Sequence, residues 1–263
     1  MSFRRWQDLT TDNFAALAAN AVAVLPVAAV EQHGPHLPVG TDAMIAEGMT
    51  GLAAEQADGE PEDILVLPQI SVGASLEHER FAGTLSVSSA GMADRIVAIA
   101  RGVKAAGLGR LVIVSSHGGN VAAMTDAALR CRAELGLLAV YLTWSRLGLP
   151  DGVVADDERA YGVHGGFVET SLMLNFRPDL VRMDKAQSFG SLQQDLGGDF
   201  ALLRAYGPVG FGWMAQDLNG GGVVGDAASA NAEAGQAIAG YQAGRFVLLL
   251  RETAAADVAK MLR

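Results

Sequence analysis

The feature that most constrains the fold is a polar segment, residues 31–42, which reads Glu-Gln-His-Gly-Pro-His-Leu-Pro-Val-Gly-Thr-Asp. It follows an apolar run over residues 21–30, whose length and β-branched residues predict a buried strand. Two glycines and two prolines prevent regular structure within the segment, and Thr41 or Asp42 can cap a helix that extends to about residue 56. The polar residues are therefore predicted to lie on a strand-to-helix loop.

Side chains of this loop can converge on one point. In an extended chain, side chains two residues apart point the same way, which brings Glu31 and His33 together, and Asp42 returns at the start of the helix. Imidazole suits zinc, iron or manganese, and a carboxylate can bridge two ions. A divalent metal site is one interpretation; the other is that Asp42 only caps the helix and the histidines fill a polar turn. The concentration of polar residues within these twelve positions favours the metal site.

The rest of the chain repeats the alternation of strands and helices. Helices are expected over residues 12–19, 42–57, 89–107, 120–136, 165–176 and 229–251, and strands over 21–30, 64–67, 110–115 and 137–143. Strands that alternate with long helices indicate parallel βαβ units. We therefore expect an α/β fold, with a three-layer α/β/α arrangement around a mainly parallel core sheet, in a single domain over residues 1–263.

Three further segments have less regular patterns. Residues 58–63 are expected to form a polar linker, and residues 183–224 contain many glycines and no clear period. A long irregular stretch inside a compact domain is often functional or at an interface. The last helix carries an apolar run, residues 246–250, that looks exposed, so this helix and the 183–224 region are candidates for a subunit interface.

Composition limits the classes of function. A net charge of -10 with scattered basic residues opposes the binding of nucleic acid. No apolar run approaches the roughly 20 residues of a membrane helix, and no signal peptide is evident at residues 1–13. Cys131, the single cysteine, cannot form an internal disulfide and is expected to be buried as a small hydrophobe. We expect a cytoplasmic protein that binds neither nucleic acid nor membranes.

None of the five histidines lies within an apolar periodic face. They are His33, His36, His78, His117 and His164. In a parallel sheet the loops after the carboxyl ends of the strands gather along one edge, and three of these histidines each follow a different predicted strand. A shared site at that edge is therefore expected.

A second polar segment lies before the helix predicted at residues 165–176. The spacing of His164 and Glu169 places His164 ahead of this helix and Glu169 on its first turn or two. A surface glutamate beside a loop histidine is the alternative. Asn120 and Asp226 are expected to be helix N-caps.

Motifs for other chemistries are weak. Residues 210–215 match a G-x-G-x-x-A pattern, but Pro208 precedes them and no convincing strand leads into them. No P-loop occurs, and Ser75 lacks the second glycine of a nucleophile elbow. Nucleotide binding and serine hydrolysis are therefore disfavoured.

Four motifs together resemble the creatininase family of metal-dependent amidohydrolases. They are residues 31–38 with Thr41 and Asp42, residues 77–84, residues 117–120 and residues 164–171. The resemblance implies a single creatininase-like domain, a homohexamer and two divalent metal ions per chain, zinc first, with manganese or iron as alternatives. It implies the metal ligands Glu31, His33, Asp42, His117 and Glu169, with Asp42 as the bridge. The catalytic residues expected from it are His164, Glu77 and His78, with His164 as a proton shuttle.

The chain also departs from the family pattern. Gly119 stands where creatininase itself is expected to have a glutamate ligand, which weakens the case for creatinine as the substrate. Ala28-Ala29 replaces the usual Gly-Ser, and Phe167 stands where an acidic residue is frequent.

The predicted function is hydrolysis of a C–N amide bond in a small, cyclic amide, with His164 protonating the leaving nitrogen. The substrate is a small molecule, and the chain is expected to form a homo-oligomer. Alternatives within the family are a formamide hydrolase and a peptidase of the mycofactocin precursor. A metal-dependent lactonase or a non-catalytic binding protein with a decayed site are further alternatives; the metal-binding type of every candidate ligand argues against a decayed site.

Overall fold

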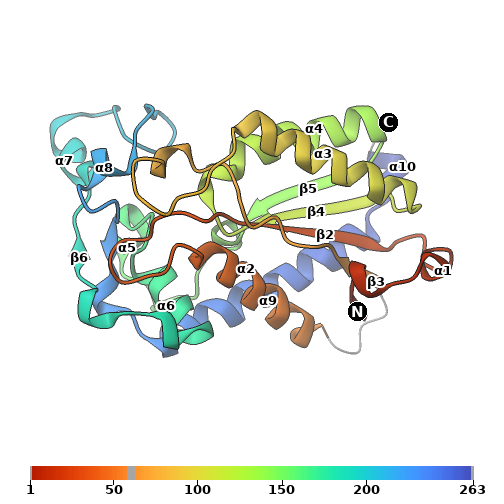
Figure 1. Cartoon of the computed structure of the whole chain (residues 1–263), viewed down its shortest axis with the longest axis horizontal. Helices are drawn as coiled ribbons and strands as arrows, with labels where there is room; N and C mark the ends of the chain where they lie inside the picture. Colours follow the sequence, from red (N-terminus) through yellow and green to blue (C-terminus); the bar gives the residue numbers. More distant parts are fainter. Residues whose placement is uncertain (1, 58–62, 262–263) are drawn as a thin grey trace.

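The computed structural model describes residues 2–57 and 63–261 and contains a five-stranded sheet in the order β1-β3-β2-β4-β5 (Figure 1). Its strands are β1 (Ser2–Arg5), β2 (Val22–Val27), β3 (Asp63–Val66), β4 (Arg110–Ser115) and β5 (Leu138–Thr143). Neighbouring strands pair in parallel throughout this sheet. The expected α/β fold with a mainly parallel core sheet is therefore confirmed.

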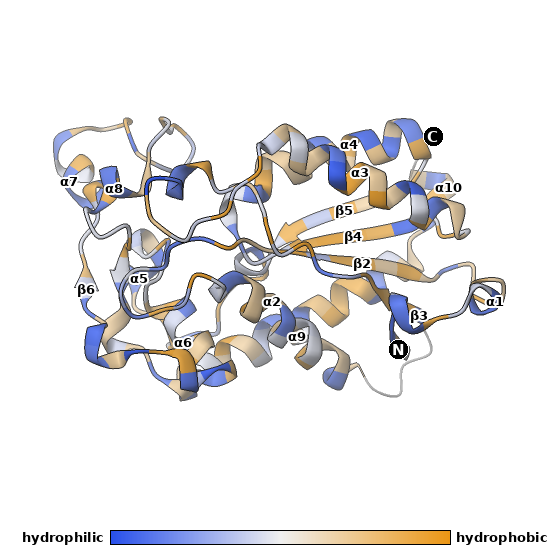
Figure 2. Cartoon of the chain, in the orientation of Figure 1, coloured by the Kyte–Doolittle hydropathy of each residue, from blue (hydrophilic) through white to orange (hydrophobic). Residues whose placement is uncertain are grey.

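Helices cover both faces of the sheet (Figure 1). On one face lie α3 (Ser89–Ala105) and α4 (Val121–Leu135), and on the other lie α2 (Thr41–Gln56), α6 (Phe167–Phe176) and α9 (Ala232–Ala255). Alternate residues of β2 serve the two layers: Val22 and Val24 pack with Phe246 of α9, whereas Ala23 and Leu25 pack with Met92 of α3. Because both faces are covered, β2 and most of β4, at the middle of the sheet, are apolar (Figure 2). The three-layer arrangement is confirmed.

The remaining elements are short. The helices are α1 (Thr11–Phe14), α5 (Asp156–Tyr161), α7 (Leu192–Asp199), α8 (Ala215–Leu218) and α10 (Val258–Met261). The 3₁₀ turns are η1 (Trp6–Asp8), η2 (Leu76–His78), η3 (Gly118–Asn120), η4 (Trp144–Leu147), η5 (Pro178–Leu180), η6 (Met183–Lys185) and η7 (Ala227–Ser229). A two-stranded antiparallel pair joins β6 (Ser188–Phe189) to β7 (Gly225–Asp226).

The first part of the chain differs from expectation. Strand β1 was not predicted, because four residues with two arginines show no hydrophobic period; it pairs with β3 at the edge of the sheet. The helix expected over 12–19 ends at Phe14, and the chain then turns so that Leu17 packs against the core. Of the predicted linker, Asp63 begins β3, and residues 58–62 lie outside the described residues.

The apolar run at residues 246–250 is mostly buried, so the prediction that it is exposed was wrong. Phe246 and Leu250 are fully buried, whereas Leu248 is 50% exposed. The run lies on α9, which packs against α2 and α6, and these helices take up its apolar stripe.

The irregular region 183–224 gathers beyond the carboxyl ends of the strands (Figure 1). Its short elements stand next to the edge where the predicted site residues converge. Within the described part of the chain, no helix has the length and apolarity needed to cross a bilayer.

Candidate active site and metal centre

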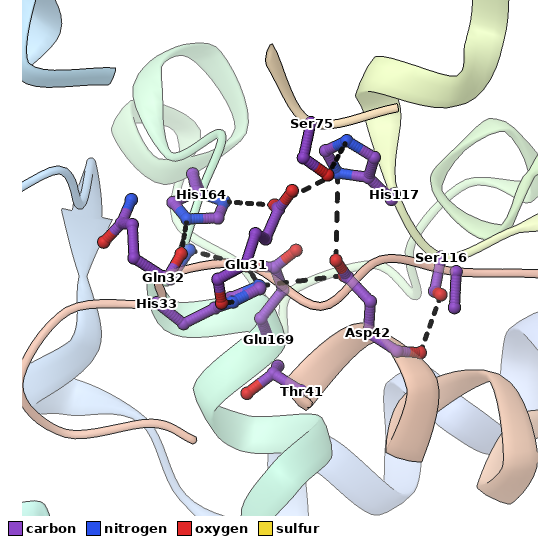
Figure 3. A network of polar contacts seen from close by, with 12 residues as sticks. Glu31, Gln32, His33, Thr41, Asp42, Ser75, Ser116, His117, His164 and Glu169 are labelled. Carbon is purple, nitrogen blue, oxygen red and sulfur yellow. Dashed lines mark hydrogen bonds and ion pairs between the residues drawn. The ribbon is translucent and has the colours of Figure 1, made fainter. Parts of the chain in front are cut away.

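The loops that follow β2, β3 and β4 meet at one edge because these three strands are neighbours in the sheet. They bring His33, His78 and His117 together, and His164 joins them from the loop before α6. Figure 3 shows His33, His117 and His164 around Glu31. His36 does not join them. Its Nε2 lies 3.0 Å from both the Gly165 carbonyl oxygen and Thr170 Oγ1, so it ties the first motif to α6 instead.

Glu31 lies at the centre of this group. Its Oε1 is 3.1 Å from His117 Nδ1 and 3.6 Å from His164 Nδ1 (Figure 3). The same oxygen is 3.4 Å from His78 Nε2. The carboxylate is fully buried. Three imidazoles from three separate loops thus surround a single carboxylate oxygen.

Asp42, on the first turn of α2, stands between two histidines. Its Oδ1 is 3.7 Å from His33 Nε2, and its Oδ2 is 3.7 Å from His117 Nδ1 (Figure 3). Each oxygen therefore faces a different imidazole. A carboxylate placed in this way can serve two ions at once.

Glu169 completes the far side of the cluster. It projects from the first turn of α6, and its Oε2 is 3.8 Å from His33 Nε2. The same oxygen accepts a hydrogen bond from the Gly165 amide at 2.6 Å, which the left-handed conformation of Gly165 (φ +63°) allows. His164 precedes the helix, as its spacing from Glu169 predicted.

Five buried polar atoms in this cluster have no hydrogen-bond partner among the described residues. They are Glu31 Oε1 and Oε2, Asp42 Oδ1 and Oδ2, and His33 Nε2. Burying such atoms unpaired costs free energy, and buried charges are normally paired or bound to metal. Carboxylate oxygens and imidazole nitrogens of the described residues converge here in three groups. They are Glu31 with Asp42 and His117, Glu31 with His78 and His164, and His33 with His164 and Glu169. The donor set therefore fits divalent cations.

Backbone carbonyls orient two of the imidazoles. His33 Nδ1 lies 3.0 Å from the Glu31 carbonyl oxygen, and His117 Nε2 lies 3.0 Å from the Ala74 carbonyl oxygen. A carbonyl oxygen only accepts, so these ring nitrogens carry the protons. In the neutral imidazoles, the nitrogens that face the carboxylates, His33 Nε2 and His117 Nδ1, then have the lone pairs that a metal needs.

The pKa values reflect the excess of carboxylates. Burial opposes the charged form of His33 and His117, yet Asp42 and Glu31 raise the pKa of each to about 10. Burial likewise opposes ionisation of Glu31, but His117, with the other histidines, holds its pKa well below the usual range. Burial, with the nearby Glu31, raises the pKa of Asp42 to about 6. In the metal-free protein, protons on His33 and His117 therefore balance the negative charge of the carboxylates, a task that bound cations would otherwise perform.

Whereas Glu31 lies near Nδ1 of the His117 ring, Glu77 lies near the other nitrogen, Nε2. Its Oε1 is 3.6 Å from His117 Nε2, and its side chain is 21% exposed. A Cβ atom at Gly119 would overlap both Glu77 Oε1 and His117 Nε2 and would lie 2.7 Å from the Ala74 carbonyl oxygen. Glu77 therefore occupies the space that any side chain at position 119 would need.

A cavity of about 330 Å³ opens beside the cluster. His164 and Glu169 line one side of it. The other walls include the apolar residues Trp144, Leu149, Val163, Val168 and Leu172. A ligand in this cavity would therefore touch two of the predicted site residues.

Sequence reasoning misassigned or missed several residues that build the site. Asn120 occupies an N-cap position, but its side chain makes no capping bond; Oδ1 accepts the Ala74 amide at 2.9 Å, and Nδ2 donates to the Ala28 carbonyl at 3.0 Å. Asp226 also makes no side-chain cap. Gln32 was within the first motif but had no predicted role, and its contacts with residues distant in sequence gave no local signal.

The chain matches one protein family over most of its length. The creatininase family model, described as creatinine amidohydrolase, matches residues 7–250. A mycofactocin precursor peptide peptidase from Mycolicibacterium smegmatis is 38% identical over 165 residues, which is 62% of this chain and only 61% of that protein. A creatinine amidohydrolase from Pseudomonas putida is 29% identical over 188 residues, or 64% of this chain and 69% of that protein.

Solved structures share the fold. One named "Creatininase Mn" superposes with a TM-score of 0.76 at 24% sequence identity, covering 97% of this chain and 100% of that one. The family model spans most of the chain, and this protein therefore belongs to the creatininase family.

Proposed function

We propose that the protein is a metal-dependent hydrolase of a C–N amide bond in a small, cyclic amide. The observation that carries this proposal is the set of five buried, unpartnered atoms contributed by Glu31, Asp42 and His33. Such a set is costly to the fold, so it requires a function. The relative named creatinine amidohydrolase supports an amide as the substrate.

Two divalent ions would be held by five side chains. Glu31, Asp42 and His117 would hold the first, and His33, Glu169 and the second oxygen of Asp42 would hold the other. Zinc is the first choice, with manganese or iron as alternatives, and solved creatininases named as Mn and Zn-Zn forms support this choice. When bound, such ions lower the pKa of a water molecule and polarise a carbonyl group.

His164 would move the proton. Its Nε2 lies 2.7 Å from the Gln32 carbonyl oxygen and so donates to it, which leaves the Nδ1 lone pair directed toward Glu31. Burial, with His33 nearby, lowers the pKa of His164 to about 4, so the imidazole is neutral near pH 7. It can therefore accept a proton from the attacking water at Nδ1 and then pass this proton to the leaving nitrogen.

The cavity limits the size of the substrate. Its volume of about 330 Å³ is near the lower end of ligand sites, which run from roughly 300 to 1,000 Å³. Its apolar wall, including Trp144 and Leu172, would bury a compact ring while His164 faces the scissile bond. These dimensions support a small amide.

A second candidate is cleavage of a peptide bond in a precursor peptide. It is favoured by the relative named mycofactocin precursor peptide peptidase, which is 38% identical to this chain. The chemistry at the cluster would be the same. Only the part of the substrate that occupies the cavity would differ.

The test begins with metal content. Protein purified without chelator or affinity nickel is analysed by plasma mass spectrometry, and about two equivalents of zinc, manganese or iron are expected. The same preparation is then assayed with creatinine, other cyclic amides, formamides, short peptides and a lactone. Turnover of an amide supports the proposal, whereas a chain that refuses added metal, or that cleaves only the lactone, contradicts it.

We also propose that the chain forms a homohexamer in the cytoplasm, as the family resemblance suggests. Exposed apolar side chains in the 183–224 region support a subunit interface there: Phe200, Leu202, Leu203, Val209 and Phe211. Sedimentation of the purified protein tests this expectation, and a monomer at micromolar concentration would contradict it.

A further inference from the structure

The side chain of Gln32 has only one orientation that satisfies its neighbours. Its Nε2 lies 2.6 Å from the Gly222 carbonyl oxygen, which can only accept. Its Oε1 lies 3.0 Å from the Gly34 amide nitrogen, which can only donate. The amide group of Gln32 must therefore present NH₂ to Gly222 and oxygen to Gly34.

This orientation determines the proton position on His78. The Gln32 Nε2 atom is also 2.9 Å from His78 Nδ1. An amide NH₂ has no lone pair to offer, so His78 Nδ1 must be the acceptor. The imidazole of His78 therefore carries its proton on Nε2, the atom that lies 3.4 Å from Glu31 Oε1.

Residue 32 determines the proton position on His164 as well. The Gln32 backbone carbonyl accepts from His164 Nε2 at 2.7 Å, so the lone pair of His164 is on Nδ1. The two imidazoles lie with ring centroids 4.2 Å apart and ring planes tilted by 31°, and a nitrogen of each lies within 3.6 Å of Glu31 Oε1. One presents an N–H group to this oxygen and the other presents a lone pair, so they cannot have the same role.

We infer that Gln32 and His78 form a relay that orients Glu31 for metal binding, and that His78 is a positioning residue and not a metal ligand or a proton shuttle. Although His78, His164 and Glu31 are close enough to form a ligand triad, His78 presents a proton where a metal needs a lone pair. The inference rests on the proposed metal-dependent function. It also replaces the catalytic role that the sequence suggested for His78.

The relay begins in the glycine-rich segment that ends the irregular region. Gly222 belongs to a turn in which its amide bonds to the Asn219 carbonyl at 2.8 Å, and Val224 pairs with His164. The carbonyl that orients Gln32 is therefore held by the same segment that holds His164. A change in this segment would reach His78 through two hydrogen bonds, and His78 Nε2 lies 3.4 Å from Glu31 Oε1.

The first experiment reads the tautomer directly. Nitrogen NMR of histidine-labelled, metal-free protein should show His78 with its proton on Nε2. Gln32→Glu replaces the donor by an acceptor, so the proton should move to Nδ1. The matched control is Gln193→Glu, because Gln193 is another buried amide that donates to a carbonyl, Tyr206, and accepts from a backbone amide, Ala205. A proton on Nδ1 in the unaltered protein would overturn the inference.

The second experiment measures metal affinity by competition with a chelator. His78→Leu removes the donor and should weaken metal binding about 10- to 100-fold, the usual effect of losing a partner of a ligand. His78→Gln keeps an N–H donor at a similar reach and should restore most of the affinity. Equal affinity for His78→Leu and the unaltered protein would overturn the relay, whereas a failure of the unaltered protein to bind metal would contradict only the proposed function.

Discussion

Glu31 and Glu158 are both buried glutamates, yet their surroundings differ. Glu158 accepts hydrogen bonds from the backbone amides of Phe167 and Asp226, each at 2.8 Å. Glu31 is fully buried, and neither of its oxygens has a hydrogen-bond partner within residues 2–57 and 63–261. One carboxylate is satisfied by the fold itself, and the other is left with histidines alone.

This difference separates groups that build the fold from groups that serve the site. A buried carboxylate costs free energy unless hydrogen bonds or opposite charges compensate it. Glu158 joins α5 to the start of α6 and to β7, so its compensation also stabilises the loop that carries His164. Glu31 lacks such compensation, which is why we assign it to cation binding.

The largest effect is expected for Glu31→Gln, which keeps the shape of the side chain and removes its charge. Loss of a group that hydrogen-bonds to a metal ligand already lowers metal affinity about 10- to 100-fold. Loss of the ligand itself should therefore lower both affinity and turnover by at least about 100-fold. Equilibrium dialysis and an amide assay measure the two effects. Glu79→Gln, an exposed neighbour of the site, is the control. Metal retention by Glu31→Gln would contradict the assignment of Glu31, and not Glu158, to cation binding.

His164→Ala separates catalysis from metal binding. The variant should keep its metal and lose turnover by about 10²- to 10⁴-fold, the range expected for removal of a general acid or base. Metal content by mass spectrometry and kcat are measured on the same sample of the variant and of the unaltered protein. Unchanged turnover would remove His164 from the mechanism.

The convergence of the histidines could be predicted because it follows from topology. His33 and His117 lie just beyond adjacent parallel strands, and the order of elements along the chain already placed those loops at one edge. Asp42 was predictable for the same reason, since it begins the helix after the first strand. The apolar strands and periodic helices therefore determined most of the site.

The supporting contacts could not be predicted because their partners are far apart in sequence. Gln32 reaches Gly222 across 190 positions, and His36 reaches Thr170 across 134. The burial of Glu158 had no signal in the sequence because its carboxylate is compensated by backbone amides, which any residue carries. The loss of the expected cap at Asn120 has the same cause: its side chain found better partners in two other loops.

Metal removal should make stability depend on pH. In the metal-free protein the nearby carboxylates raise the pKa of His33 and His117 to about 10, above the ordinary value of 6.5. The folded chain then holds protons that the unfolded chain has released, so the free energy of unfolding should fall between pH 6.5 and 10. The slope is about 1.4 kcal/mol per pH unit for each histidine at most.

Thermal unfolding at a series of pH values measures this slope, with and without chelator. The metal-bound protein should not show it, because a bound cation replaces the protons on both histidines. Equal slopes for the two forms would mean that the cluster does not exchange protons for metal.

The smallest effect is expected for Glu158→Gln, and it tests the other half of the comparison. Glutamine offers one oxygen to the two backbone amides of Phe167 and Asp226, so one amide is left facing an NH₂ group. An unsatisfied buried donor costs about 1–3 kcal/mol, measured as a change in the free energy of unfolding by urea. Asp157→Asn, an exposed neighbour on the same helix, should change stability by less than about 0.5 kcal/mol. Because the hydrogen bonds of Glu158 go to the backbone of Phe167 and Asp226 and not to a candidate metal ligand, its variant should retain the metal that Glu31→Gln loses. Joint loss of metal would show that the two glutamates form one unit.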